Sequence, residues 1–207
     1  MTVAHETAAA GARPNAFTQD ELGWTPWLPP LAESELSERH WAGLVEASRA
    51  KSPYFMLLVR DPEVLEARTK TDKDIFTNVS GGLPRAEREL AATAVSRSNG
   101  CIFCASVHAR FASVHSKRRD EVQRLLDEGT DVDIDERWNA VVAASVALTA
   151  TPPAFGQPHV DRLRRAGFDD LAILDVIQSA AFFNWANRLM LSLGEPEAAK
   201  PQAAAPR

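Results

Sequence analysis

The chain has 207 residues, of which 45% are hydrophobic, and its formal net charge is −5. That length and composition suffice for one domain with a sizeable core, or for two small lobes. Because the charge balance is acidic and no long block of like charges occurs, no nucleic-acid partner is expected.

The N-terminal stretch has no basic region followed by an apolar run, so no signal peptide is expected. The longest apolar run is far shorter than the roughly 18 residues that cross a bilayer, so no membrane association is expected either. Both cysteines lie in one motif, which is typical of a reducing compartment and of a catalytic or metal-binding role. These features predict a soluble, cytoplasmic protein.

Helical periodicity dominates the chain, and no segment shows sustained period-two alternation. The sequence therefore predicts an all-α fold without a sheet, built as a bundle of seven to nine helices with short loops. A shorter apolar turn or helix is expected at residues 54–59. The longer helices are expected at about 34–48, 63–79, 85–97, 101–115, 117–128, 137–150, 159–166 and 169–193.

The expected domain organisation is simple. Residues 1–16 are predicted to be disordered, 17–194 to form one helical domain, and 195–207 to be a flexible tail. Residues 17–31 read as an extended arm anchored by tryptophans, which packs either on its own domain or around a neighbouring subunit. The later helices echo the earlier ones coarsely, so a duplicated helical hairpin is a further hypothesis.

One twenty-residue stretch concentrates the chemistry of the chain. Residues 89–108 read ELAATAVSRSNGCIFCASVH and hold both cysteines, Cys101 and Cys104. His108 follows Cys104 by four residues. The Asn-Gly pair before Cys101 predicts a break between two helices. On the second helix the two cysteines and His108 follow the spacing i, i+3 and i+7, so they share one face.

A cysteine at a helix N-terminus is favoured as a thiolate, and a C-x-x-C pair can close a disulfide with little backbone movement. Glu89 lies about three turns back on the preceding helix. Its carboxylate reaches the thiols if the two helices pack together; otherwise it is a solvated charge beside neighbouring arginines. Glu87 faces a different side of that helix and is the better candidate for a solvated charge.

The combination E-x11-C-x-x-C-x-x-x-H, followed by a helical C-terminal half, resembles the alkylhydroperoxidase D-like (AhpD-like) branch of the carboxymuconolactone decarboxylase family. The close likeness covers residues 83–112, and a weaker one extends over residues 26–196 and indicates the peroxidase-related members. It implies an AhpD-like helical bundle, a homo-oligomer (a trimer or a hexamer), and thiol-dependent reduction of hydroperoxides. The decarboxylases of the wider family lack the cysteine pair, so decarboxylation fits this chain poorly.

By position, the resemblance implies that Cys104 is the peroxidatic thiol and that Cys101 is its proton donor and resolving thiol. Glu89 and His108 would then form a proton relay. The chain departs from the founding hydroperoxidases at Phe103, where those proteins carry a histidine between the cysteines.

Four further residues are candidates for the walls of a substrate pocket. Phe103, Phe111 and Phe183 would supply apolar surface for an organic hydroperoxide. Asn187 belongs to a polar seam on the last helix. This seam either hydrogen-bonds a neighbouring helix or borders the thiol pocket.

Three classes of function fit the cysteine pair. The leading hypothesis is a hydroperoxide reductase that needs no metal or other cofactor and is recycled by a dithiol protein or a small thiol. The second is a redox-sensing or electron-transfer adaptor with a reversible disulfide and little turnover. The third is a zinc protein with Cys101, Cys104, His108 and Glu89 as ligands, which is disfavoured because no second cysteine pair exists.

Overall fold

A computed structural model describes residues 14–80 and 82–198 of the chain. Most of the N-terminal segment and of the tail for which disorder was predicted lies outside these residues. Within them, the fold is all-α apart from one short two-stranded sheet, as the periodicity predicted. The helices are α1 (Glu38–Leu44), α2 (Pro53–Leu58), α3 (Pro62–Thr77), α4 (Arg85–Ser98), α5 (Ile102–Ser116), α6 (Arg119–Glu128), α7 (Glu136–Thr149), α8 (Gln157–Arg165) and α9 (Asp170–Leu193).

The helix boundaries follow the local chemistry of the sequence. Asp61, Asp135 and Asp169 each precede a helix and accept a hydrogen bond from a backbone N–H of its first turn. Gly100 adopts a left-handed φ of 76° in the turn between α4 and α5, a conformation that costs a glycine little. The break that the Asn-Gly pair predicted therefore stands where the cysteine motif begins.

The first predicted helix, residues 34–48, is divided in the structure. A 3-10 turn η1 (Glu33–Glu35), helix α1 and a second 3-10 turn η2 (Ala47–Lys51) replace it. Ser37 caps α1, and Val45 ends it with a φ of 64°, which is rare for a β-branched residue. Apolar spacing continues across such an interruption, so periodicity alone could not locate it.

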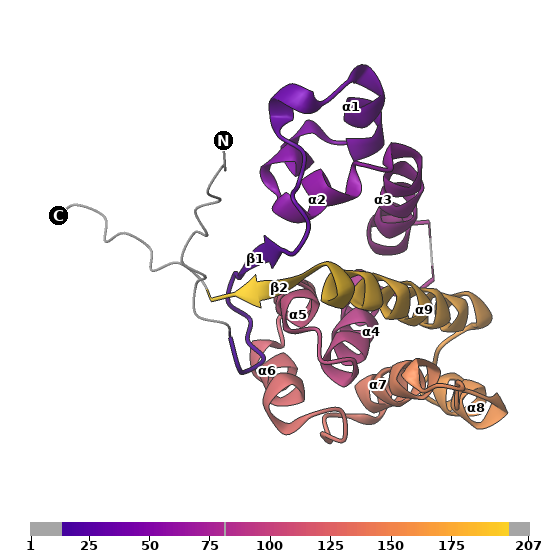
Figure 1. The fold of residues 1–207 in the computed structure, drawn as a ribbon. Helices are drawn as coiled ribbons and strands as arrows, with labels where there is room; N and C mark the ends of the chain where they lie inside the picture. Colours follow the sequence, from indigo (N-terminus) through magenta and orange to yellow (C-terminus); the bar gives the residue numbers. More distant parts are fainter. Residues whose placement is uncertain (1–13, 81, 199–207) are drawn as a thin grey trace.

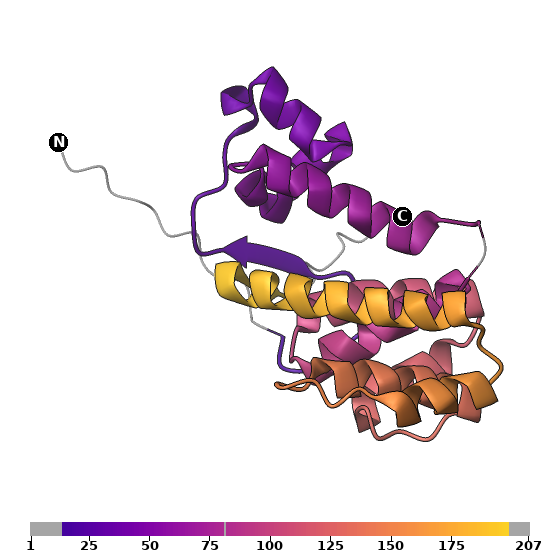
Figure 2. The same ribbon diagram turned by 90° about the vertical axis from the view of Figure 1, so that its right-hand side faces the viewer.

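Helix α9 runs through the middle of the molecule (Figures 1 and 2). The N-terminal helices α1, α2 and α3 lie on one side of it, and α6, α7 and α8 lie on the other. Helix α4 is central, because it packs against α5, α7 and α9. Its residues from Glu87 to Ser96 are all buried.

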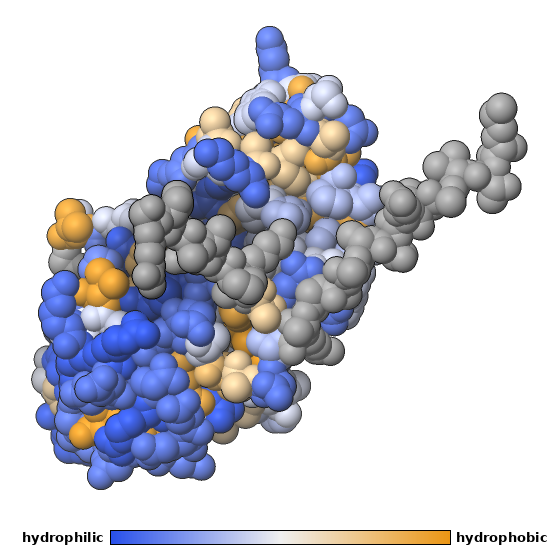
Figure 3. Space-filling view, turned by 90° about the vertical axis from the view of Figure 1, so that its left-hand side faces the viewer, coloured by the Kyte–Doolittle hydropathy of each residue, from blue (hydrophilic) through white to orange (hydrophobic). Residues whose placement is uncertain are grey.

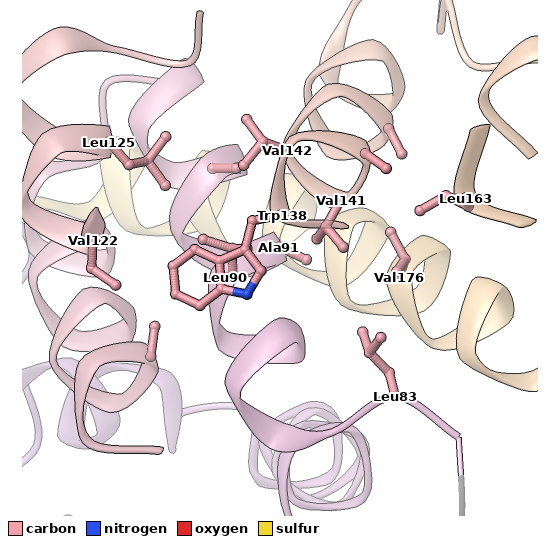
Figure 4. Close-up of a cluster of buried hydrophobic side chains, with 14 of the residues drawn as sticks. Leu83, Leu90, Ala91, Val122, Leu125, Trp138, Val141, Val142, Leu163 and Val176 are labelled. Carbon is pink, nitrogen blue, oxygen red and sulfur yellow. The ribbon is translucent and has the colours of Figure 1, made fainter. Parts of the chain in front are cut away.

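The larger apolar cluster lies on one side of α4, between α4, α5, α6, α7 and α9. Trp138 of α7 belongs to this cluster together with Leu90 and Ala91 of α4 (Figure 4). Small side chains on α4, α5 and α7 let the helices approach closely, and larger ones fill the remaining space. Leu90, Val122, Leu125 and Val141 are completely shielded from solvent.

The prediction that the chain has no sheet was wrong at one place. Strand β1 (Gly23–Pro26) of the arm pairs antiparallel with β2 (Gly194–Glu197), directly after α9. The start of the predicted flexible tail is therefore an ordered strand. Two four-residue strands far apart in sequence are too short to show a period-two pattern, and each contains a proline.

The arm packs on its own domain, which was one of the two alternatives. Trp24 is buried, and its ring lies 5.4 Å from that of Tyr54 in an edge-on arrangement. The backbone N–H of Trp27 donates to the carbonyl of Leu193, and that of Leu31 donates to the carbonyl of Met56. We call the paired strands with Trp24 the clasp, since they join the arm to the end of α9.

Hydrophilic residues cover most of the lower part of the face that Figure 3 shows, and hydrophobic residues form only small groups there. Within residues 14–80 and 82–198, no helix combines the length and apolar character that a membrane span requires.

Candidate active site

A cavity of about 520 Å³ lies between the N-terminal helices and the central ones. Its size is in the range of ligand sites, roughly 300–1,000 Å³. One wall comes from η2, α2 and α3, and the other comes from α4, α5 and α9. Three of the four predicted catalytic residues, Glu89, Cys104 and His108, line it.

Glu89 and His108 form a buried hydrogen-bonded pair. Oε2 of Glu89 lies 2.6 Å from Nδ1 of His108, and the Glu89 side chain is only 1% exposed. The other carboxylate oxygen accepts a hydrogen bond of 3.1 Å from Nε of Arg85. The carboxylate is therefore held at both oxygens, and of the two alternatives for Glu89 the solvated charge is wrong.

The imidazole of His108 is held by aromatic rings as well. The ring of Phe183 lies 4.0 Å from it, edge-on, and that of Phe76 lies 5.2 Å away. With Nδ1 facing Glu89 and both rings packed against it, the imidazole is fixed in orientation. An imidazole positioned in this way can act as a general acid or base toward a group within its hydrogen-bond reach.

Glu87 differs from the prediction of a solvated charge. It is buried, and its Oε1 accepts a hydrogen bond of 3.0 Å from Nε of Arg137 on α7. Two residues along a helix place side chains on different faces. Glu87 is therefore a structural partner of α7, whereas Glu89 faces the cavity.

The two cysteines are free thiols that differ in their surroundings. Cys101 occupies the N-cap position of α5 and is 1% exposed, whereas Cys104 is 5% exposed and lines the cavity. Hydrogen bonding from the Cys104 thiol, followed by its backbone N–H, lowers the pKa of Cys101 even though burial opposes this. The hydrogen bond with Cys101, followed by burial and by the charge of Cys101, raises the pKa of Cys104.

The pair is thus best described as one unit with two ionisations. The first proton leaves easily, because the remaining S–H donates to the thiolate that forms. The second is held tightly, because a second negative charge would form beside the first. The thiol with the lowered pKa therefore lies at the helix end, and the thiol with the raised pKa lies at the cavity.

The predicted pocket residues divide into two groups. Phe103, Phe111 and Phe183 line the cavity, and the guanidinium of Arg85 lies 5.2 Å from the Phe111 ring. Asn187 does not line it but is completely buried behind the wall. Its amide donates to Ser96 and accepts from Asn99, and hydrogen bonding from Asn187 counters part of the rise in the pKa of Cys104.

Sequence reasoning missed the basic end of the cavity. Arg49 of η2 and Arg68 of α3 line it, together with Tyr54 and Phe55 of α2. A signal was present: Arg68 lies three residues after the buried Leu65, on the apolar face of α3. A charged residue at a core-facing helical position is rarely buried without a partner, so it marks a site worth testing.

The zinc alternative receives no support from the geometry. No group of three or more His, Cys, Asp or Glu side chains lies close enough to hold a metal ion anywhere in the described ranges.

The model of the carboxymuconolactone decarboxylase family matches residues 62–147. This segment of the chain is therefore similar to that family. Glu89, Cys101, Cys104 and His108 all lie within the matched segment, whereas α9, which completes the cavity, follows it.

Solved structures show the AhpD-like fold over most of the chain. A peroxidase-related protein with an alkylhydroperoxidase AhpD core from Ralstonia eutropha JMP134 superposes with a TM-score of 0.69 at 21% identity, covering 81% of this chain and 90% of that one. A peroxidase-related protein from Silicibacter sp. TM1040 gives 0.67 at 22% identity, covering 84% and 92%.

The debrominase Bmp8 shares the fold too, with a TM-score of 0.64 at 19% identity, covering 80% of this chain and 89% of that one. Among curated protein sequences, no match was found.

Proposed function

We propose that this protein is a thiol-dependent hydroperoxide reductase that uses Cys101 and Cys104 as a redox pair. The observation that carries this proposal is the cavity itself. It holds one thiol of a C-x-x-C pair and a buried Glu89–His108 pair, 2.6 Å apart, within the same walls. A carboxylate–imidazole pair beside a dithiol supplies both the protons and the electrons that peroxide reduction consumes.

The reaction begins with the thiol pair singly ionised. The Cys101 sulfur takes the proton from the Cys104 thiol, and the Cys104 thiolate attacks the terminal oxygen of a hydroperoxide. The O–O bond breaks, and the departing alkoxide takes a proton from the Glu89–His108 pair to become an alcohol. Cys104 is left as a sulfenic acid, oxidised by two electrons.

Cys101 then closes the cycle. Its proton passes to the Glu89–His108 pair, and its sulfur attacks the sulfur of the Cys104 sulfenic acid. The hydroxyl leaves as water with that proton, and a Cys101–Cys104 disulfide forms. A dithiol reductant, protein or small molecule, returns two electrons and two protons. Cys101 is only 1% exposed, so we expect reduction to start at Cys104, which borders the cavity.

Turnover of cumene hydroperoxide with dithiothreitol as the reductant tests the proposal. Cys104→Ser should abolish turnover, because no nucleophile then borders the cavity. Cys101→Ser should still react once and accumulate a Cys104 sulfenic acid, which dimedone traps and mass spectrometry locates. Activity that survives in Cys104→Ser would refute the proposal that Cys104 is the nucleophile.

One measurement distinguishes the hydroperoxide reductase from a redox-sensing or electron-transfer adaptor. Stoichiometric peroxide should remove two hydrogens from the wild-type mass and join Cys101 to Cys104 under either hypothesis. A disulfide that forms without catalytic turnover at excess dithiothreitol would indicate a redox-sensing or electron-transfer protein instead.

A second candidate activity is reductive dehalogenation. It is favoured by the likeness to the debrominase Bmp8, a variant of which was crystallised with 2,3,4-tribromopyrrole. The same dithiol can supply the two electrons: an aryl bromide and two thiols give the arene, a disulfide, bromide and a proton. The aromatic walls of the cavity suit a flat ring. Bromide release from 2,3,4-tribromopyrrole, compared with turnover of cumene hydroperoxide, decides between the two.

A further inference from the structure

Arg68 presents buried hydrogen-bond donors without partners at the edge of the cavity. Its side chain is 8% exposed and is surrounded by the rings of Tyr54, Phe55 and Phe182, each within 5.8 Å of the guanidinium carbon. Nε and Nη1 lack a hydrogen-bond partner among the described residues, although Asp72 lies 3.6 Å from Nη1. Burying such donors without partners is costly unless a ligand completes them.

Arg49 repeats this arrangement beside one of the same rings, that of Phe55. Its side chain is 13% exposed, and its guanidinium lies 4.4 Å from the centre of the Phe55 ring, which Arg68 also approaches, at 5.6 Å. Nε of Arg49 also has no hydrogen-bond partner in the part of the chain that the structure describes. Two guanidinium groups therefore converge on one ring with free donors.

The charges that line the cavity do not cancel. Arg49, Arg68, Lys73 and Arg85 contribute four positive charges, against three negative ones from Glu46, Asp72 and Glu89. Lys73 pairs with Glu46, and Arg85 pairs with Glu89. The excess charge is left with Arg49 and Arg68. Asp72 is the counter-charge that both arginines share, and Glu46, at 3.7 Å from Arg49, is already paired with Lys73.

We propose that Arg49 and Arg68 bind the carboxylate of an organic acid whose apolar body fills the cavity and whose reactive end meets Cys104. The position of the reactive end rests on the proposed function, whereas the carboxylate site does not. Guanidinium groups are suited to this role, because their planar N–H donors match a carboxylate geometrically. The preferred substrates are then hydroperoxides that carry a carboxylate.

Two further observations agree with this arrangement. The cavity that the arginines and the thiol share also has apolar walls, with Phe76, Phe183 and Met190 among them. The charge of Arg68 is also close enough to favour the thiolate form of Cys104, which counters part of the rise in its pKa. One ligand of moderate size can therefore span from Arg68 to Cys104.

Calorimetry with 4-isopropylbenzoate and its methyl ester tests the carboxylate site without any thiol chemistry. We expect reduced wild-type protein to bind the acid at least about tenfold more tightly than the ester, because hydrogen bonds to charged groups contribute that much or more. Arg68→Met should remove this preference, Arg49→Met should weaken it, and Arg68→Lys should restore part of it. Arg124→Gln, which alters an exposed arginine of α6, should keep it.

Equal binding of acid and ester, no binding of either at millimolar concentration, or an unchanged preference in Arg68→Met would each overturn the carboxylate site. Turnover of cumene hydroperoxide and of its para-carboxylated derivative provides the second arm. The derivative should show a kcat/KM about tenfold higher in the wild type and no advantage in Arg68→Met. A binding preference without any turnover refutes the peroxidase proposal alone, and turnover without a binding preference refutes the carboxylate site alone.

Discussion

Helix α4 separates two clusters of buried side chains that differ in chemistry. On one side, Leu90, Ala91 and Ala94 join the cluster around Trp138, which is apolar and closely packed (Figure 4). On the other side, Ala92 and Val95 join the cluster that contains both cysteines and borders the cavity. The same helix therefore contributes to the stability of the fold on one face and to the cavity with the reactive side chains on the other.

The second side keeps features that reduce stability. Three of the six buried side-chain polar atoms without a hydrogen-bond partner in the described residues belong to Arg49 and Arg68. The same side holds both cysteines and borders a cavity of about 520 Å³. Proteins retain such strained or unpaired groups where ligands and reactions use them. The contrast predicts that substitutions on the two sides change different measurable properties.

The largest effect is expected from Glu89→Gln, which keeps the size of the side chain but removes its charge and its basic oxygen. Hydroperoxide turnover should fall by about 100-fold or more, which is the usual contribution of general acid–base catalysis. The matched control is Glu87→Gln, since Glu87 pairs with Arg137 away from the cavity. Equal losses in the two variants would contradict the division of α4 into two faces.

Leu90→Ala should lower the stability of the fold and leave the activity nearly unchanged. Leu90 is completely buried, so its truncation should lower the free energy of unfolding by about 3 kcal/mol, through lost burial and a new cavity. Turnover by the folded variant should stay close to the wild-type value. Urea denaturation measures the first quantity, and Leu171→Ala on the exposed part of α9 is the control, with a change of less than about 0.5 kcal/mol expected. A large loss of activity in folded Leu90→Ala protein would show that the two sides are coupled.

Gly194→Ala tests the clasp. A Cβ at this position would lie 2.3 Å from the Thr25 carbonyl oxygen and 2.3 Å from the Trp24 ring. Such overpacking should destabilise the fold by about 1–3 kcal/mol. At Gly156, by contrast, the nearest atom to an added Cβ is 3.8 Å away, so Gly156→Ala should leave the melting temperature nearly unchanged. The clasp is not required for stability if both variants melt together.

The smallest effect concerns the pH dependence of the thiols. Because the pKa of Cys101 is lowered from the ordinary value of 9.0, the ultraviolet absorbance of its thiolate should appear at a lower pH than that of a free cysteine. The main cause is the Cys104 thiol, so Cys104→Ala should raise the pKa of Cys101 and move the absorbance titration to higher pH. Cys101→Ala gives the background, because it lacks this thiolate. An unmoved titration would mean that the helix end, rather than the neighbouring thiol, sets the ionisation.

Much of the fold was predictable because helical spacing and capping residues act locally. The helix starts predicted at residues 63, 137 and 169 lie within two residues of the starts of α3, α7 and α9. The clasp was not predictable, because pairing between residues 23–26 and 194–197 depends on the folded bundle and has no local signal. The sequence also did not predict the interruption at Val45, because apolar residues continue on both sides of it.

The site was predictable in part. The spacing of Cys104 and His108 placed them on one helical face, and the structure adds the 2.6 Å contact from His108 to Glu89. The roles of these residues stay predictions until turnover is measured. Arg49 and Arg68 come from segments 20 or more residues before the motif. They reach one cavity because η2 packs against α2, and α3 packs against α4 and α9.

The clasp also has an optical consequence. Its buried Trp24 ring lies against Tyr54, and Tyr54 in turn lies 5.8 Å from the guanidinium carbon of Arg68. An anion that arrives at Arg68 changes the electric field at this aromatic chain, so the fluorescence emission of Trp24 should shift when the cavity fills. In a variant that retains Trp24 alone among the five tryptophans, occupancy could be followed in real time without a labelled ligand.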